Sequence, residues 1–297
     1  MSVDKMLLKK DLKEKRELVN IEIDRFLPRK DEYPKKIHKA IRHTLFAGGK
    51  RLRPYLLLST YQLFADDLKP ALPIAGAIEM LHSYTLIHDD LPEMDNDDYR
   101  RGKKSCHVVY GSDIALLAGD ALLIYAFDAI NSADIDEKLK LKMIKELAEE
   151  TGHKGLIAGQ MVDILSEDQQ VTPETLEFIH NNKTARLINL AIRFGCYLAD
   201  VDEEEIEIME EVGKKLGLAF QITDDILDVE GDQNSVGKTL GKDKKEKKAT
   251  YPSVYGLEKS KAMAEELIKE AKELLDKFGE KAELLRRLAD FILVRKF

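Results

Sequence analysis

Residues 203–228 read EEEIEIMEEVGKKLGLAFQITDDILD, and apolar side chains recur there every three or four positions. That spacing predicts an amphipathic helix. Its centre, Leu216–Ile222, is apolar on most sides, and so is Ala71–Leu81 in a second stretch that also runs into aspartates. A helix that is apolar all round belongs in the middle of a protein. The two stretches therefore predict central helices of a many-helix bundle.

The same periodicity covers almost the whole chain and predicts an all-α fold. Thr172-Pro173-Glu174 and Ser112-Asp113 are typical helix starts. No alternating strand pattern of useful length and no shift in composition is present, so we expect one domain over residues 1–297. The predicted helices are Leu7–Phe26, Pro34–Phe46, Arg53–Phe64, Leu72–His88, Asp113–Asn131, Glu137–Met161, Pro173–Leu198, Glu203–Asp228, Lys259–Phe278 and Glu283–Val294.

The composition excludes several classes of protein. The formal net charge of -8, without a basic stripe among aromatics, argues against a general nucleic-acid binder. Cys106 and Cys196 form no CxxC motif, which is typical of reduced cytosolic thiols. The N-terminus lacks the apolar core of a signal peptide. The longest apolar stretch, Ile114–Ile130, contains aspartates and predicts a buried helix and no membrane span. We therefore expect a soluble, cytoplasmic protein.

Two aspartate clusters carry the chemistry. Paired carboxylates at the end of an apolar helix repel each other unless a cation is present. Asp224 and Asp228 are four residues apart and share one helical face. In the first cluster, Asp89 and Asp95 are six apart, and Pro92 should end the helix and bring Asp95 back. Because Mg2+ takes one or two protein carboxylates together with phosphate oxygens, the clusters and their basic neighbours predict a diphosphate site.

Basic segments near both clusters are candidates for binding phosphate. In Gly48–Pro54, GGKRLRP, two glycines allow close approach of the backbone, and Lys50 with Arg53 can clamp phosphate oxygens; a solvated basic turn after a helix is the alternative. The pair Arg100-Arg101 follows Asp95 and allows the same two interpretations. Residues 231–239 resemble a P-loop, but five residues separate the glycines where the motif has four, and a helix precedes them. A diphosphate contact is the better interpretation of Lys238.

Single polar residues on the apolar helices are further candidates. His82 lies two turns before Asp89 on the same face, although a lone histidine is more often a packed core residue. Gln221 precedes Asp224 by three residues, and since a buried amide needs a partner, we expect it to face a cavity. The spacing of Lys183-Thr184 leaves open whether these residues face solvent or the site.

Five motifs together resemble the trans-isoprenyl diphosphate synthase family, and within it the bacterial farnesyl diphosphate synthases. The resemblance runs in order from about Ile37 to the C-terminus, and the two Asp-rich motifs are highly specific to the family. The motifs are GGKRLRP (48–54), HSYTLIHDDLPEMDNDDYRRG (82–102), KTARL (183–187), AFQITDDILD (219–228) and VGKTLGKD (236–243).

The resemblance implies an all-α homodimer of the isoprenoid synthase type, with helices around a deep apolar cavity and the two Asp-rich motifs across its mouth. It implies about three Mg2+ ions per site. The implied metal ligands are Asp89, Asp95 and Asp224, supported by Asp90, Asp225 and Asp228. The implied contacts of the allylic diphosphate are Arg100, Lys183 and Lys238. The implied contacts of isopentenyl diphosphate are Lys50, Arg53, His82 and Arg101, and Thr184 and Gln221 would lie near the developing cation.

The implied reaction is prenyl transfer in isoprene biosynthesis: ionisation of an allylic diphosphate, attack by isopentenyl diphosphate, and loss of a proton. Tyr84, five residues before Asp89 and about 7.5 Å down the helix axis, would block the growing chain. With the insertion Leu91-Pro92, this resembles the enzymes that make fifteen-carbon products. We therefore expect farnesyl diphosphate from dimethylallyl and geranyl diphosphates.

Other products and roles stay open. Thr85 is small and lies beside Tyr84, which keeps a geranylgeranyl diphosphate synthase as the alternative. A non-catalytic subunit of a heteromeric prenyl synthase would be expected to have degraded acidic motifs, and both are complete here. A terpene cyclase normally carries Asn, Ser and Glu ligands in its second motif. The Lys242–Lys248 run is either a lid over the site or a solvated loop.

Overall fold

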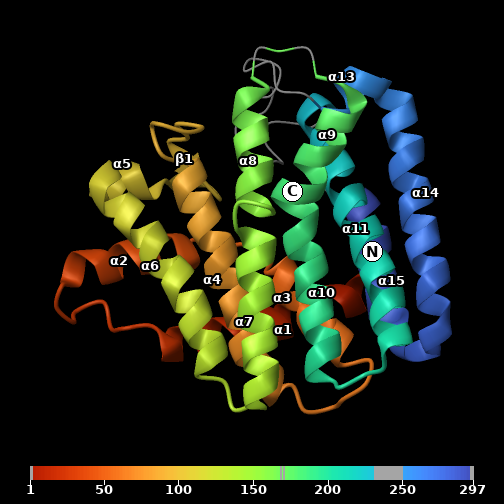
Figure 1. Ribbon diagram of the computed structural model, residues 1–297, viewed down its shortest axis with the longest axis horizontal. Coiled ribbons are helices and arrows are strands. Elements are labelled where there is room, and N and C mark those ends of the chain that lie inside the picture. The colour runs from red at the N-terminus through yellow and green to blue at the C-terminus, as the bar shows by residue number, and fades with distance from the viewer. Residues whose placement is uncertain (1–2, 168, 170, 231–249, 295–297) are drawn as a thin grey trace. The chain divides into compact units, whose positions relative to one another are not determined.

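The computed structural model describes residues 3–167, 169, 171–230 and 250–294 (Figure 1). This part of the chain is almost entirely helical, as predicted. Strand is confined, within the described ranges, to β1 (Tyr99–Arg100) and β2 (Lys103–Lys104), which pair antiparallel in one short hairpin. The chain groups into two compact units: an N-terminal unit of Lys9–Leu58 and Asp67–Ile144, and a C-terminal unit of Met1–Leu8, Ser59–Asp66 and Lys145–Phe297.

In the N-terminal unit, the central helix is α4 (Leu72–Asp89), which packs against α6 (Ser112–Asn131) and α2 (Lys35–Leu45) (Figure 1). Every residue of α4 from Ile74 to Leu81 is buried, in keeping with its prediction as a helix apolar on most sides. The other elements of this unit are most of α1 (Val3–Phe26), most of α3 (Leu52–Tyr61), η1 (Lys69–Ala71), α5 (Cys106–Tyr110) and the first half of α7 (Glu137–Thr151).

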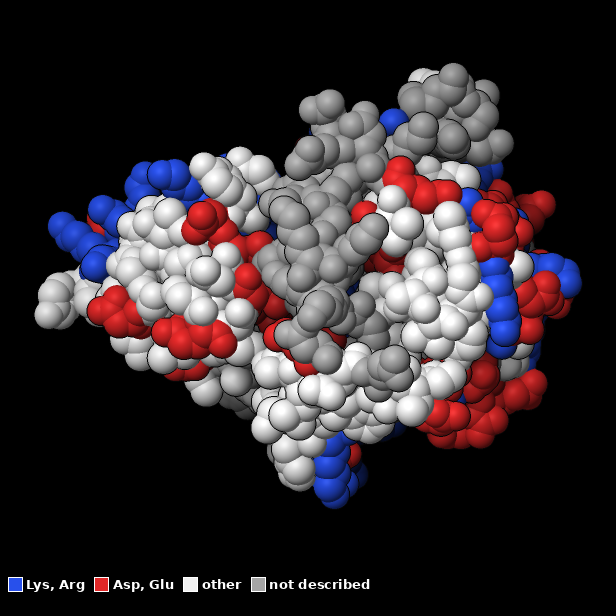
Figure 2. Space-filling model, turned by 90° about the horizontal axis from the view of Figure 1, so that it is seen from above, with Lys and Arg blue, Asp and Glu red and all other residues white. Residues whose placement is uncertain are grey.

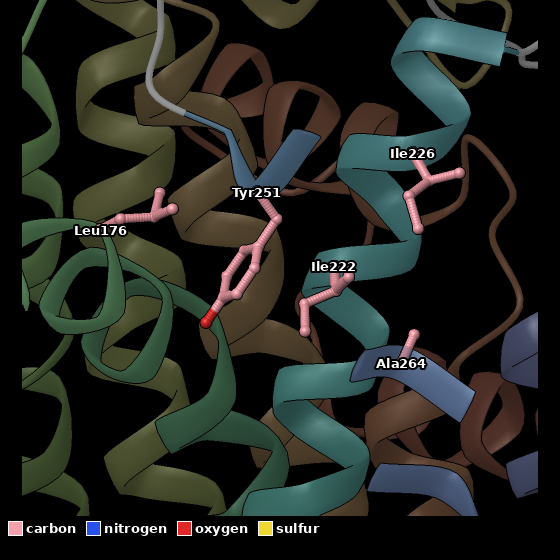
Figure 3. Close-up of a cluster of buried hydrophobic side chains, with 5 residues drawn as sticks. All are labelled: Leu176, Ile222, Ile226, Tyr251 and Ala264. Atoms are coloured by element: carbon pink, nitrogen blue, oxygen red, sulfur yellow. The ribbon is translucent and has the colours of Figure 1, made fainter. Parts of the chain in front are cut away.

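In the C-terminal unit, the long helix α11 (Glu203–Glu230) is central and packs against α10 (Arg186–Leu198), α14 (Leu257–Leu275) and α15 (Glu283–Val294). The remaining elements are α8 (Leu156–Leu165), α9 (Pro173–His180), the π-helical turn η2 (Asn181–Ala185), α13 (Tyr251–Tyr255) and η3 (Asp276–Ala282). One apolar cluster joins α9, α11, α13 and α14; it consists of Leu176, Ile222, Ile226, Tyr251 and Ala264 (Figure 3). This cluster fixes α13 beside the aspartates of α11.

The periodicity of the sequence located the helices well. The prediction for Glu283–Val294 agrees with α15, and the start expected at Thr172 is confirmed, because its side chain accepts the N–H of Thr175. The prediction of one continuous helix over Glu137–Met161 was wrong, since α7 ends at Thr151 and α8 begins at Leu156. Glycines lie in this break: at Gly155 a Cβ atom would overlap the carbonyl oxygen of Glu150, so only glycine permits the turn.

None of the helices described combines the length and the low polarity that a membrane crossing requires. The apolar stretch Ile114–Ile130 lies in α6, and the prediction of a buried helix there was wrong in part, because Leu116, Leu117 and Ile124 are 46%, 54% and 66% exposed. Acidic side chains are spread over the face drawn in Figure 2, with Lys and Arg in smaller groups, in keeping with the formal net charge of -8.

Candidate active site

The first aspartate cluster lies where α4 ends. The helix stops at Asp89, before Pro92, as predicted. The chain then turns back, because the backbone N–H of Asp95 donates to the carbonyl oxygen of Asp89 (2.8 Å) and that of Asn96 donates to Leu91 (3.0 Å). The side chain of Leu91 is buried and anchors this loop. The fold thus returns Asp95 to the end of the helix that carries Asp89.

Beside this loop, Arg100 is tied to two carboxylates. Its Nε donates to Oδ1 of the buried Asp90 (2.9 Å), its Nη2 donates to the same oxygen, and Nη2 also contacts Asp97 (3.2 Å). Burial of the Arg100 guanidinium lowers its pKa, but the hydrogen bond and the negative charge of Asp90 outweigh this effect, so the pKa of Arg100 is raised. Asp90 and Arg100, predicted for metal support and diphosphate binding, therefore also fix the β1–β2 hairpin to the end of α4.

The glycine-rich basic loop lies in the same unit. Gly48 and Gly49 both have positive φ (121° and 108°), as do Arg51 (55°) and Arg101 (54°). Arg51 Nη1 and Arg101 Nη1 both donate to the carbonyl oxygen of Gly48, over 3.1 and 2.7 Å. A Cβ atom on Gly49 would lie 2.5 Å from Cζ of Arg101. The second glycine therefore allows the Arg101 guanidinium to lie flat against the loop.

The predicted isopentenyl diphosphate contacts come together around His82. Arg53 Nη1, in the first turn of α3, lies 3.3 Å from His82 Nε2, and Lys50 is half-buried in the loop just before α3. Part of the His82 side chain is reached by water, yet burial first, and then the charges of Arg53, Arg101, Arg51 and Arg100, hold its pKa well below the usual value. Burial and the four arginines therefore favour the neutral form of His82.

Tyr84, the predicted chain-length residue, is 6% exposed on α4. Its ring meets the ring of His88 edge to face, with centroids 5.3 Å apart. His88 is held in turn by α6: its Nε2 lies 3.1 Å from the carbonyl oxygen of Leu116, and any side chain at Gly119 would overlap the imidazole. Burial first, and then the charge of Asp89, raises the pKa of Tyr84 to about 12. Thr85 bonds back to the carbonyl oxygen of His82 (2.8 Å).

In the C-terminal unit the second aspartate cluster lies near the end of α11. Asp225 is 4% exposed, and its carboxylate accepts the backbone N–H of Tyr251 (2.9 Å) and the side-chain amide of Gln221 (3.1 Å). Asp228 is also buried, whereas Asp224 is half-buried. The side-chain amide of Gln221 thus donates to Asp225, one turn along the same helix. Asp225 anchors the start of α13.

Lys183 and Thr184 lie on the π-helical turn η2. A π turn inside a longer helix is often found at functional sites. This turn fits closely against its neighbours, because a Cβ atom on Gly159 of α8 would overlap the backbone N of Lys183 and one on Gly217 of α11 would lie 2.8 Å from Ala185. Lys183 Nζ donates to Oδ2 of Asp163 on α8 (2.6 Å). Asp163, which was not predicted as a site residue from the sequence, therefore fixes the orientation of the Lys183 side chain.

Three further side chains escaped prediction from the sequence. Glu79 is a carboxylate within an apolar helix, and that isolation was a usable signal of a buried ion pair. Asp163 and His180 gave no such signal, because they acquire their partners, Lys183 and Asp225, only in the fold. Lys238 and the Lys242–Lys248 run lie outside the described residues.

Metal ligation does not come from one preformed group of side chains. Within the ranges that the structure describes, no three His, Cys, Asp or Glu side chains gather closely enough to hold an ion by themselves. That agrees with the chemistry of Mg2+, which takes only one or two protein carboxylates and otherwise keeps water or phosphate oxygens.

The chain is similar to known proteins over almost its whole length. A family model described as polyprenyl synthetase matches residues 34–288. A geranylgeranyl diphosphate synthase of Cyanophora paradoxa is 45% identical over 96% of this chain and 95% of its own length. A farnesyl diphosphate synthase of Bacillus subtilis is 42% identical over 89% of this chain and 90% of its own. The crystal structure of a Helicobacter pylori geranyltransferase, complexed with magnesium and isoprenyl diphosphate, superposes with a TM-score of 0.84 at 30% identity, over 99% of this chain and 97% of that one.

Proposed function

Because the chain belongs to the polyprenyl synthetase family, we propose that it condenses isopentenyl diphosphate with dimethylallyl and geranyl diphosphates to give farnesyl diphosphate. The chain is a trans-prenyltransferase of isoprenoid biosynthesis, with the all-α isoprenoid synthase fold. Its relatives include synthases of both fifteen- and twenty-carbon products at similar identity, so the proposed product rests on the residues of this chain. One synthase domain over residues 1–297 and a homodimer belong to the same proposal.

The observation that carries the fifteen-carbon product is the braced ring of Tyr84. It lies five residues before Asp89, about 7.5 Å down the axis of α4. The edge-to-face contact with His88, and the support of His88 by Leu116 and Gly119, restrict the rotation of the ring. A fixed ring stops a growing chain better than a mobile one. Geranylgeranyl diphosphate is the alternative product, favoured by the small Thr85 and by the relative from Cyanophora paradoxa.

The aspartates fit Mg2+ by their donor chemistry. Carboxylate oxygens are hard ligands, and the turn after α4 returns Asp95 to Asp89. On α11, Asp225 accepts hydrogen bonds from Tyr251 and Gln221, which makes Asp224 the better candidate ligand. We assign the ions to Asp89, Asp95 and Asp224, with Asp90, Asp225 and Asp228 in support. The chemistry that bound Mg2+ supplies is stabilisation of the negative charge on the departing diphosphate.

The basic residues bind and orient the two diphosphates. We assign isopentenyl diphosphate to Lys50, Arg53, His82 and Arg101, because the last three surround one region of the N-terminal unit. We assign the allylic diphosphate to Arg100, Lys183 and Lys238. Arg100 and Lys183 are already oriented by Asp90 and Asp163, so little conformational freedom is lost when substrate binds.

The reaction needs no protein nucleophile. The C1–O bond of the allylic diphosphate breaks, and its electron pair leaves with the diphosphate oxygen. The isopentenyl double bond then forms the new bond to C1, and loss of a proton to the released diphosphate restores a double bond. Thr184 and Gln221 are assigned beside the developing cation, and the apolar residues around Tyr84 would keep water from it.

Product analysis tests the proposal. Purified protein, Mg2+ and labelled isopentenyl diphosphate are combined with dimethylallyl, geranyl or farnesyl diphosphate in separate reactions, each repeated with a metal chelator. We expect a fifteen-carbon product from the first two substrates, little extension of farnesyl diphosphate, and no product with chelator. Efficient extension to twenty carbons would replace the proposed product with geranylgeranyl diphosphate. No product in any reaction would favour a non-catalytic subunit.

A further inference from the structure

Glu79 is a carboxylate in the most apolar part of α4 and is 1% exposed. Both of its sequence neighbours, Ile78 and Met80, are buried as well. An ionised carboxylate in such surroundings costs several kcal/mol unless it is paired and hydrogen-bonded. Its presence therefore depends on specific cationic partners.

Two arginines from two different loops meet this carboxylate. Arg51 Nη1 donates to Oε1 of Glu79 over 2.6 Å, and Arg101 Nη2 lies 3.6 Å from the same oxygen. The two arginines also share the carbonyl oxygen of Gly48 as an acceptor. Glu79 is thus the point at which the loop after α2 and the loop between β1 and β2 are held to α4.

The backbone at both arginines is strained. Each lies in the left-handed region, where a residue with a Cβ atom crowds the following carbonyl oxygen. Arg51 is fixed there by additional bonds to Asn20 and to the carbonyl oxygen of Leu45. Such conformations persist where the surroundings over-determine them, and they cluster at ligand sites. The contact with Glu79 is one of the interactions that supports both.

The charges around Glu79 do not balance. The Glu79 carboxylate, which carries one negative charge, contacts the guanidinium groups of both Arg51 and Arg101. Burial lowers the pKa of Arg101, Glu79 opposes that shift, and Arg51 and Arg100 add to it. The surplus positive charge suits an anion, and the carboxylate sets how large that surplus is.

We propose that Glu79 is a positioning residue for isopentenyl diphosphate, whose carboxylate holds Arg101 in the orientation that receives the diphosphate. The inference rests on the proposed function, which assigns Arg101 to that substrate. Without the carboxylate, Arg51 and Arg101 repel each other. Arg51 is the more firmly bonded and the more deeply buried of the two, so Arg101 is the one that moves toward solvent.

The test compares Glu79→Gln, which removes the charge at nearly constant shape, with Glu79→Asp, which keeps it. The KM for isopentenyl diphosphate is measured at saturating geranyl diphosphate, and the KM for geranyl diphosphate at saturating isopentenyl diphosphate. We expect Glu79→Gln to raise the KM for isopentenyl diphosphate about tenfold or more, because one charge-assisted contact is lost. The KM for geranyl diphosphate should stay within about twofold. Glu79→Asp should recover part of the loss.

A matched control separates positioning from folding. Glu146 accepts from Tyr197 and pairs with Arg193 in the C-terminal unit, and neither partner is assigned to substrate. Glu146→Gln should lower the melting temperature as Glu79→Gln does, without a change in either KM. Equal shifts of both KM values in Glu79→Gln, or a lower melting temperature with an unchanged KM for isopentenyl diphosphate, would reduce Glu79 to a structural ion pair.

Binding of inorganic diphosphate by calorimetry distinguishes the failure of this inference from that of the proposed function. Weaker binding by Glu79→Gln than by the unmodified protein supports the inference even if no condensation product forms. Equal binding by the two proteins contradicts it, whatever the product assay shows. If Glu79→Gln does not fold, Glu79→Asp is measured in its place: its shorter side chain reaches less far toward Arg101, so its binding should be weaker than that of the unmodified protein, and equal binding would contradict the inference.

Discussion

The backbone N–H of Asp95 donates to the carbonyl oxygen of Asp89 over 2.8 Å, so a backbone hydrogen bond joins the two aspartates where the chain returns after α4. Leu91 closes the loop from within by accepting from Met94 and Asn96. Replacing one carboxylate by an amide should therefore leave the geometry of the loop intact, which makes the metal assignment directly testable.

Asp95→Asn should lower kcat about 100-fold and raise the concentration of Mg2+ required for half-maximal activity, because an amide is a weaker, uncharged ligand. Its melting temperature should stay within a few degrees of the unmodified protein. The measurement is product formation over a titration of Mg2+. A variant with the same Mg2+ requirement would remove Asp95 from the ligands.

Tyr84→Ala should shift the main product from fifteen to twenty carbons or more, since the change removes the ring that we assign as the floor of the chain-binding region. Tyr84→Phe keeps the ring and its edge-to-face contact with His88, and should keep the fifteen-carbon product. Chromatography of the labelled products distinguishes the two variants. The same product from both would place the floor elsewhere.

Gly49→Ala should raise the KM for isopentenyl diphosphate about tenfold, because the new methyl group occupies the place of the Arg101 guanidinium. Gly48→Ala is the matched control: its φ is similarly positive (121°), but no atom lies within 4 Å of the added Cβ. Both variants strain the backbone, and only the first displaces Arg101. Equal KM values for the two would mean that backbone strain alone is responsible.

His180 should make the protein less stable in mild acid. Burial lowers its pKa to about 4, against the opposing charge of Asp163, whereas the unfolded value is near 6.5. Above pH 6.5 the histidine is neutral in both states and contributes no pH dependence. As the pH falls toward 4, His180 binds a proton in the unfolded state more readily than in the folded state. The free energy of unfolding therefore falls by about 2 kcal/mol by pH 5 and by about 3 kcal/mol by pH 4.

Urea unfolding at pH 7, 6 and 5 measures this loss. His180→Phe retains an aromatic ring against Tyr251, and its free energy of unfolding should fall less between pH 7 and pH 5 than that of the unmodified protein. Identical pH dependence in the unmodified protein and His180→Phe would contradict the assignment.

Helix positions could be predicted from the sequence because a helix that buries one face carries apolar side chains every three or four positions, and this spacing is visible in the sequence. That period predicted the helix α4, at whose end Asp89 lies. The chemistry of proline predicted that the helix ends before Pro92. The π-helical turn at Lys183 could not be predicted from the sequence, because a single inserted residue hardly disturbs the helical period. The turn depends on its fit to Gly159 and Gly217.

The distinct environments of Asp224 and Asp225 were equally beyond the sequence. The two residues are identical and adjacent, and what distinguishes Asp225 is its set of tertiary contacts, among them the backbone N–H of Tyr251 and the imidazole of His180. Likewise, the partners of Glu79 come from loops about 28 and 22 residues away along the chain, where no periodicity connects them. Local pattern predicts which element a residue joins, and tertiary contact decides what its side chain does.

The close fit of the Lys183 turn sets a limit for engineering this protein. Replacing helical glycines by alanine is a common route to higher thermostability, worth about 1 kcal/mol per site from helix propensity. Gly159 and Gly217 lie within helices and would be chosen by that rule, yet a methyl group at either would press on the backbone of η2. We therefore expect a stability screen to reject Gly159→Ala and Gly217→Ala, so the general rule fails at the two glycines that pack against the Lys183 turn.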